Sequence, residues 1–178
     1  MTMTNDYEND VIVDTTFLGL LKKVRGEDWR PPARLLSIDP GETTGWSYFE
    51  EGQLKHYGQI VIPTFKDSRI DAMDLWYLFE RYKPDAVVIE GYRIYAAKAK
   101  HHTWSALYTP KLIGYLEAIC QHSNRAVKDV SYYIQMASSK MFCTNEKLKR
   151  WGYYPAGERH AADAIRHGCY WLLFHGRK

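Results

Sequence analysis

Residues 35–49, LLSIDPGETTGWSYF, constrain the fold more than any other stretch of this chain. An almost wholly apolar run ends in Asp39, and Pro40-Gly41 follow it as a strong turn sequence. A second run, rich in aromatic residues, then begins at Gly45. The pattern predicts a short central strand, a tight turn and a returning strand, with one carboxylate at the turn.

The composition indicates an ordered globular domain. The chain has 178 residues, 46% of them hydrophobic and 15% aromatic, which is enough to bury a substantial core. We expect residues 1–33 to form an extension with a short helix and residues 34–178 to form one domain. No apolar run approaches the ~18 residues of a membrane span, and the start, MTMTNDYEND, has no signal-peptide features. The lack of such a run predicts no membrane partner, and three cysteines without metal-binding spacing favour a reduced intracellular compartment.

Charge is distributed unevenly along the chain. Residues 1–90 carry 10 Lys and Arg against 16 Asp and Glu, whereas residues 91–178 carry 14 against 5 and six of the seven histidines. A basic half favours an anionic partner, most simply nucleic acid. The alternative is a solvated basic surface with no partner.

Periodicity and turn residues predict a mixed sheet flanked by helices. Strands are expected at 35–38, 46–50 and 54–62, joined as an antiparallel meander, and again at 86–89 and 126–130. Helices are expected at 14–25, 69–82, 103–122 and 160–174, with another opening within 134–140. The first helix, capped by Asp14-Thr15, is expected to pack on the domain or on another subunit.

Two short apolar strands each end in an acid, Asp39 after LLSI and Glu90 after AVVI. If these strands are neighbours, the two carboxylates lie side by side at one edge of the sheet. A third acid, Asp163, lies in the alanine-rich sequence HAADAI, where a buried carboxylate is costly unless it is paired or binds a metal. Neighbouring carboxylates repel one another unless a cation lies among them, and oxygen-only clusters suit Mg²⁺ or Mn²⁺.

Each acid also has a purely structural explanation. Asp39 begins a good turn sequence, and Asp163 has Arg159 and Arg166 close to helical spacing as ion-pair partners. Glu90 is the hardest to explain in this way, because the residues around it carry little turn signal. The case for a shared site depends on the joint placement of the three acids.

The ordered motifs IDPGETTGW, VVIEGY and HAADAI resemble the RuvC-type Holliday-junction resolvases of the RNase H-like superfamily, and phage-encoded versions more than the cellular enzyme. The resemblance covers about residues 34–174. It implies an RNase H-like α/β fold, with a mixed five-stranded sheet of three antiparallel strands and then parallel strands, flanked by helices. It also implies a metal-dependent endonuclease that makes paired nicks in four-way DNA junctions, in the cytoplasm of a cell or of a phage host.

The resemblance assigns catalytic metal ligands position by position. Asp39 is expected to bind both of two Mg²⁺ (or Mn²⁺) ions, Glu90 one of them and Asp163 the other. His160 takes the place of the family's fourth ligand, and its spacing of three from Asp163 puts both on one helix face. Taken alone, His160 is better explained as a surface histidine near the helix start.

Two basic stretches are predicted to contact DNA. The first, directly after Glu90, comprises Arg93, Tyr95, Lys98 and Lys100. Tyr92 and Tyr95 are its candidates for stacking on bases. The second comprises Lys140, Lys147, Lys149 and Arg150, of which Lys140 stands where the resembled family has a DNA-contacting lysine. The alternative for both is aromatic residues packed under a solvated basic surface.

The resembled family dimerises through the helix expected at 103–122, and a two-fold junction calls for a two-fold dimer. The expected dimer face comprises Leu107, Leu112, Gly114, Tyr115 and Leu116. Gly114 also suggests close packing of another backbone, since glycine costs about 1 kcal/mol against alanine inside a helix. The alternative is ordinary core packing.

Two further hypotheses stay open. One is a non-cleaving module of the same fold that binds branched DNA or a protein. The other is a nuclease of the same fold that acts on flaps, forks or packaging intermediates. The intact acids disfavour the first, because a pure binder gains nothing from crowded carboxylates. A Walker A motif is absent, so no ATP-driven activity is expected.

Overall fold

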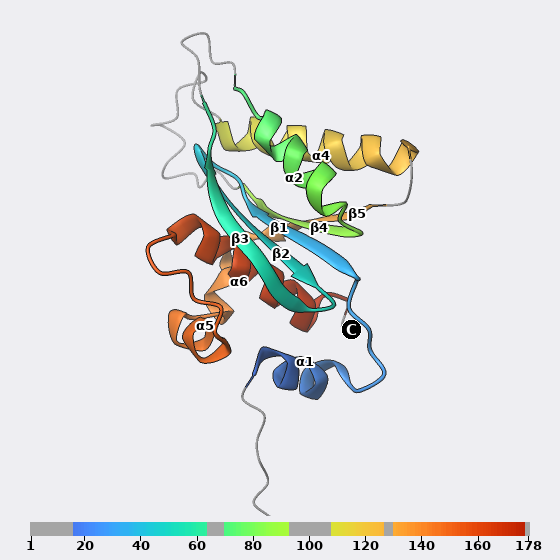
Figure 1. Cartoon of the computed structure of the whole chain (residues 1–178), viewed down its shortest axis with the longest axis vertical. Helices are drawn as coiled ribbons and strands as arrows, with labels where there is room; N and C mark the ends of the chain where they lie inside the picture. Colours follow the sequence, from blue (N-terminus) through green and yellow to red (C-terminus); the bar gives the residue numbers. More distant parts are fainter. Residues whose placement is uncertain (1–15, 64–69, 93–107, 127–129, 177–178) are drawn as a thin grey trace, which may run out of the picture.

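The computed structural model describes residues 16–63, 70–92, 108–126 and 130–176. Its centre is a five-stranded sheet in the order β3-β2-β1-β4-β5 (Figure 1). The strands are β1 (Arg34–Asp39), β2 (Thr43–Glu50), β3 (Gln53–Val61), β4 (Ala86–Gly91) and β5 (Ser131–Met136). The first three pair antiparallel, whereas β4 is parallel to β1 and β5 is parallel to β4. This order confirms the predicted RNase H-like mixed sheet.

Helices cover both faces of the sheet (Figure 1). On one face lie α2 (Met73–Tyr82) and α4 (Tyr108–Ala126), and on the other lie α1 (Phe17–Arg25), α5 (Asn145–Trp151) and α6 (Arg159–Phe174). A 3-10 helix, η2 (Ala137–Phe142), follows β5. Strand side chains alternate between faces, so Leu36 and Ile38 join the core with α2 and α4, while Leu35 joins the core with α6. None of the described helices has the length and apolarity of a membrane span.

The N-terminal helix α1 packs on the domain itself. Arg25, at its end, donates from Nε to the Leu172 carbonyl (2.7 Å) and from Nη2 to the Trp171 carbonyl (3.3 Å). These carbonyls belong to the last turn of α6, where a positive charge is favourable. The helix is capped by Thr16, whose hydroxyl accepts from an amide of the first turn. The predicted cap, residues 14 and 15, lies outside the described residues.

Two adjacent predictions differ from the structure. At the described ends of the strand expected at 126–130, Ala126 ends α4 and Val130 precedes β5, so this strand prediction is wrong there. The helix expected to open within 134–140 is confirmed in part, because residues 134–136 belong to β5 and the 3-10 helix η2 opens at Ala137. The β5 sequence, SYYIQM, has two tyrosines and an isoleucine, which favour a strand, and it pairs in parallel with β4 along its whole length. The start of α2 is also later than expected, at Met73. The other predicted strands and the C-terminal helix are confirmed.

Helix α6 approaches the sheet at two glycines. A Cβ atom at Gly45, on β2, would overlap the backbone carbonyl of His160, and a Cβ atom at Gly168 would overlap the ring of Phe49. Any side chain at Gly45 therefore forces the first turn of α6 away from β2. Glycine at position 45 therefore allows the first turn of α6 to lie directly against β2.

Gly45→Ala should destabilise the protein, because a methyl group there meets backbone that cannot rotate away. We expect a loss of at least the ~1–3 kcal/mol typical of overpacking, measured by urea unfolding. Gly114→Ala on α4 is the matched control in dilute, monomeric protein, since nothing in the described chain lies within 4 Å of its Cβ position. That variant should gain up to about 1 kcal/mol from helix propensity. Wild-type stability in Gly45→Ala would contradict the close approach.

Candidate active site

Asp39 and Glu90 lie side by side at the carboxyl ends of β1 and β4. The two strands pair in parallel with Ile38 opposite Ile89, so the next residue on each is an acid. Strand alternation puts both acids on the face that α6 covers. The neighbouring strands on which the sequence prediction depends are therefore confirmed.

The first turn of α6 adds His160 and Asp163. His160 Nδ1 lies 3.2 Å from Asp39 Oδ2. The backbone amide of His160 donates to the Gln59 side chain on β3 (2.9 Å), which ties the start of α6 to the sheet. Asp163, one turn further along, is only 8% exposed. The close approach at Gly45 is what brings this turn to the acids.

Lys140, from η2, joins two of the acids. Its Nζ lies 3.1 Å from each carboxylate oxygen of Glu90 and 2.8 Å from Asp163 Oδ2. Burial alone would lower the pKa of Lys140, but the hydrogen bond to Asp163 and the charges of both acids raise it above its usual value. The ammonium is therefore charged, and it lies between Glu90 and Asp163, where it reduces the repulsion between their carboxylates.

Asp39 and Glu90 differ in protonation. Burial, together with the hydrogen bond shared with Glu90, raises the pKa of Asp39 to about 8. Burial acts in the same direction on Glu90, but hydrogen bonds with His167 and Asp39 outweigh it, so the pKa of Glu90 lies below its usual range. At neutral pH Asp39 is the protonated member of the pair and Glu90 the ionised one. A metal ion bound by Asp39 has to displace that proton.

Asp163 has a second cationic partner, Arg166, three positions along α6. Arg166 Nη1 donates to Asp163 Oδ1, Nη2 donates to the Asn145 side chain at the start of α5, and Nε donates to a carbonyl between η2 and α5 (3.0 Å). Of the two ion-pair partners considered from the sequence, Arg166 makes this contact and Arg159 is exposed. The ion pair takes one carboxylate oxygen of Asp163, and the other remains with Lys140.

Sequence reasoning misses two residues of this cluster, His167 and Gln135. His167 is fully buried on α6, and its Nε2 lies 3.0 Å from Glu90 Oε2. Gln135, on β5, places its amide nitrogen 2.7 Å from His167 Nδ1. A signal for His167 exists, because it follows Asp163 by four positions and shares its helix face. Gln135 carries no such signal, because only the pairing of β5 with β4 brings it to the site.

The donor set suits a divalent cation of the Mg²⁺ type. Asp39, Glu90 and Asp163 supply the hard oxygen ligands that such ions prefer. Within the described ranges, however, no three acidic, histidine or cysteine side chains converge closely enough to share one ion. Lys140 lies between two of the acids. Metal binding between them requires this ammonium to move aside.

A cleft of about 240 Å³ opens beside the acids. It is lined by Asp39, Pro40, Glu90, Gly91, Tyr92, Thr109 and Ala137. Both strand-end carboxylates are therefore accessible from one opening. Tyr92, a predicted stacking residue, is half-buried in this lining.

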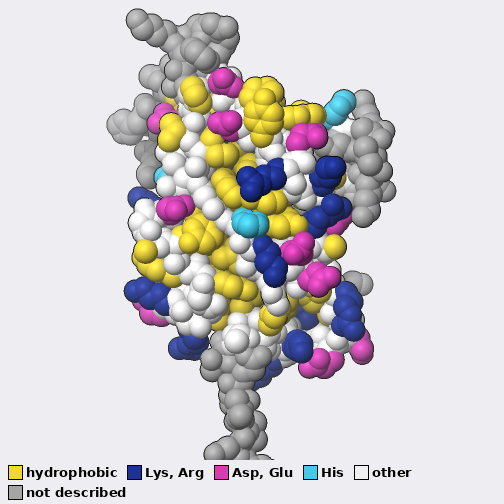
Figure 2. All heavy atoms as spheres, viewed as in Figure 1, with side chains coloured by type: hydrophobic (Ala, Val, Ile, Leu, Met, Phe, Trp, Pro, Cys, Tyr) yellow, Lys and Arg dark blue, Asp and Glu magenta, His cyan; other side chains and the backbone are white. Residues whose placement is uncertain are grey.

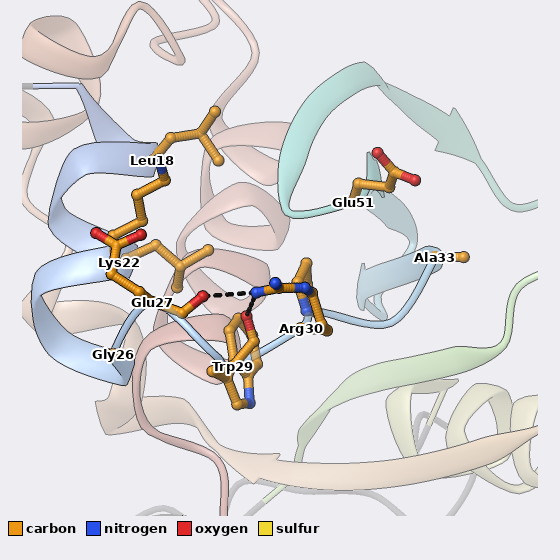
Figure 3. A pocket seen from close by; sticks show the side chains of 10 residues that line it. Leu18, Lys22, Gly26, Glu27, Trp29, Arg30, Ala33 and Glu51 are labelled. Atoms are coloured by element: carbon orange, nitrogen blue, oxygen red, sulfur yellow. Dashed lines mark hydrogen bonds between the residues drawn. The ribbon is translucent and has the colours of Figure 1, made fainter.

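A larger pocket, of about 470 Å³, lies elsewhere, between α1, the loop after it and the β2–β3 turn (Figure 3). Leu18 and Trp29 contribute apolar walls, and Arg30 Nη1 donates to the carbonyls of Glu27 (2.6 Å) and Trp29 (3.1 Å). Its lining has no histidine, cysteine or buried acid. We assign no chemistry to this pocket.

The predicted DNA contacts fall into three groups. Arg93, Tyr95, Lys98 and Lys100 lie outside the described residues. Lys140 lies within the acid cluster. The rest, Lys147, Lys149 and Arg150, lie on α5, where the ammonium of Lys147 covers the Phe142 ring and that of Lys149 covers the Tyr154 ring. On the face shown in Figure 2, Lys and Arg are interspersed with Asp and Glu, so this face has no continuous basic stripe.

The predicted dimer face is wrong in part. Leu112 and Leu116 are fully buried in the core beneath α4, and Tyr115 packs against the same core. Leu107 lies outside the described residues. Gly114 is exposed, with open space around it. Core packing therefore explains the leucines, whereas Tyr115 is partly buried and Gly114 is exposed.

The sheet order and the helices on both faces define an RNase H-like α/β fold. Among solved structures, the chain is similar to Thermus thermophilus RuvC, with a TM-score of 0.54 and 16% identity over 79% of this chain and 93% of RuvC. It is also similar to T. thermophilus RuvC in complex with a Holliday junction substrate (TM-score 0.51, 16% identity, 79% and 92% covered). A third similar structure is the yeast mitochondrial Holliday junction resolvase Ydc2 (TM-score 0.53, 16% identity, 86% and 83% covered). The RuvC-like resolvase fold implied by the motifs is thereby confirmed. Comparison with protein-family models and with curated sequences found no match.

The raised pKa of Asp39 should make metal-free stability fall as pH increases. Between the ordinary pKa of 3.8 and the folded value of about 8, the folded chain holds a proton that the unfolded chain has lost. The free energy of unfolding therefore decreases with rising pH across this window. Asp39→Asn keeps a neutral side chain, so its stability advantage over wild type should grow through the window and level off above it.

Urea unfolding in EDTA at a series of pH values measures this difference. Glu42→Gln, at an exposed acid in the same turn, is the control and should show no such trend. An Asp39→Asn advantage that does not change with pH would contradict the protonation of Asp39.

Proposed function

We propose that this protein is a metal-dependent endonuclease that resolves four-way DNA junctions by paired nicks. The observation that supports this most is the meeting of Asp39, Glu90 and Asp163, from β1, β4 and α6, beside an open cleft. Ionised carboxylates that lie close together repel one another and destabilise the folded protein, unless a cation lies between them. The similar structures include a RuvC bound to a Holliday junction substrate and Ydc2, a Holliday junction resolvase.

In this proposal Asp39 contributes to both of two Mg²⁺ (or Mn²⁺) sites, Glu90 to one and Asp163 to the other, with His160 as a fourth ligand. Divalent ions of this kind activate water for attack on a phosphodiester and stabilise charge on the leaving oxygen. Asp39 has to be deprotonated to act as a ligand, so rising pH favours the active form. Glu90 is already ionised at neutral pH and needs no such change.

Lys140 has two roles in this proposal. In the free protein its ammonium balances Glu90 and Asp163. Its long flexible stem allows it to leave them when other cations take that place. It then pairs with a phosphate oxygen of the DNA, in agreement with the contact predicted from the sequence. The lysines and arginine of α5 are further candidates for phosphate contacts, and α5 is joined to the site through the Asn145–Arg166 contact.

A four-way junction has two-fold symmetry, so paired nicks call for a two-fold dimer. We propose that the dimer forms through the exposed face of α4, which includes Lys111, Gly114 and Ala118. This face replaces the buried leucines expected from the sequence. A nuclease that acts on flaps, forks or packaging intermediates would use the same acids and differ in its substrate.

A second candidate function is a module that binds branched DNA without cutting it. The position of Lys140 favours this alternative, because its ammonium neutralises Glu90 and Asp163 without any metal ion. The two candidates differ in what Mg²⁺ does to the protein and to the DNA.

The proposed function predicts symmetric, Mg²⁺-dependent nicks in a mobile four-way junction. The measurement compares a junction, a fork and a linear duplex, with and without Mg²⁺, on denaturing gels. Asp39→Asn should abolish the nicks while junction binding, measured by gel shift, persists. Lys55→Gln, at an exposed position on β3, is a charge-loss control and should cleave like wild type.

Junction binding without cleavage by the wild-type protein would reject the nuclease and favour the binding module. Preferential cleavage of the fork would keep the site chemistry and change the substrate. Nicks in Asp39→Asn equal to those of wild type would remove Asp39 from the catalytic set.

Mg²⁺ should also stabilise the folded protein in the absence of DNA. A ligand at 100 times its dissociation constant adds about 2.7 kcal/mol to the free energy of unfolding. Lys140→Gln removes the ammonium that competes for the acids, so the Mg²⁺-induced rise in Tm should be larger in this variant than in wild type. An absence of any Mg²⁺ effect in both proteins would support the binding module.

A further inference from the structure

Glu90 and Gln135 are cross-strand partners in the parallel pairing of β4 with β5. Both side chains are on the α6 face, since Val88 and Tyr133, two positions before them, belong to the core under α6. The imidazole of His167, from α6, lies between them. Both ring nitrogens have polar partners: Nε2 contacts Glu90 and Nδ1 contacts Gln135.

The hydrogen bonds assign the tautomer of His167. The same amide nitrogen of Gln135 lies 2.7 Å from Nδ1 and 3.2 Å from the backbone carbonyl of His167. A carbonyl oxygen only accepts hydrogen bonds, so the Gln135 atom that faces it has to be the NH₂ group. This group therefore donates to Nδ1 as well, and Nδ1 has no proton. With Nδ1 as the acceptor, the ring proton is on Nε2, which donates to Glu90 Oε2.

We propose that His167, with its tautomer set by Gln135, is a positioning residue that holds Glu90 in the orientation required of a metal ligand. The inference rests on the proposed function, in which Glu90 binds one of the ions. The hydrogen bond from His167 Nε2 uses Oε2 of Glu90. Oε1, which accepts from Lys140 Nζ and not from His167, is then the oxygen available to a cation.

Two observations support a positioning role over simple core packing. His167 is fully buried, and a buried imidazole is costlier than a leucine unless its polar atoms have a use. Its neighbours on α6, Cys169 and Leu172, show that this part of the helix is otherwise apolar. Donors that orient a ligand in this way commonly change metal affinity 10–100-fold when removed.

The tautomer is tested first, in the wild-type chain without metal or DNA. Long-range ¹H–¹⁵N NMR of the histidine rings, with His167 assigned by comparison with His167→Gln, distinguishes a proton on Nε2 from one on Nδ1. We expect a single form protonated on Nε2. A wild-type ring protonated on Nδ1 would overturn the proposal whatever the activity of the protein.

The positioning role is tested by Mg²⁺ titration calorimetry on three variants. His167→Leu should weaken Mg²⁺ binding 10–100-fold. His167→Gln should restore most of it, because the glutamine NH₂ takes the place of Nε2 and donates to Glu90. His122→Gln, at an exposed position of α4, is the control and should bind like wild type. In junction cleavage, His167→Leu should lower kcat with little change in KM, because the DNA surface is untouched.

Thermal unfolding separates positioning from stability. Replacing a buried imidazole by leucine leaves the core filled, so a loss of Mg²⁺ affinity with an unchanged or higher Tm indicates positioning. Equal Mg²⁺ affinities of wild type and His167→Leu would overturn this inference and leave the proposed function intact. Wild-type protein that neither binds Mg²⁺ nor cleaves junctions would overturn both.

Discussion

Repulsion among three carboxylates, at the ends of β1 and β4 and on the first turns of α6, is the constraint on which the site depends. The fold offsets it with an ammonium from η2 (Lys140), a guanidinium from α6 (Arg166) and a buried imidazole N–H (His167). All three follow β5 in the chain, whereas two of the three acids precede α4. The uneven charge of the two halves therefore has an internal cause: part of the basic half serves the acids of the other half. Some of the basic residues in such a half can pair with acids of the same chain and not with a partner molecule.

Much of the fold could be predicted because strong local signals coincide with the elements. The turn at Pro40-Gly41 and the apolar runs that end in acids mark β1, β2 and β4. The failure at β5 has a physical reason. SYYIQM has neither a flanking turn nor a clear apolar alternation, and its strand state follows from parallel pairing with β4, a contact distant in the sequence. Helix α4 is likewise longer at its C-terminal end than its local pattern indicates.

The candidate site divides in the same way. Asp39, Glu90, His160 and Asp163 could be predicted because each lies in a recognisable motif. Their partners could not, because a hydrogen-bond partner is defined by tertiary contact and not by spacing along the chain. Lys140 illustrates the difference: sequence resemblance indicates a DNA contact, and the structure shows an ion pair with two acids. The two interpretations are compatible if the side chain exchanges one anionic partner for another.

The contact between Gly45 and the first turn of α6 has a consequence for how the protein is made. Chains emerge from the ribosome N-terminus first, and β1, β2 and β4 are complete well before α6 is synthesised. A nascent chain at that stage contains Asp39 and Glu90 but not His160, Asp163 or the lysine of η2. The surface of β2 at Gly45 remains uncovered until α6 has been synthesised and packs against it. The order of synthesis thus delays assembly of the acid cluster until the strands that support it have been made.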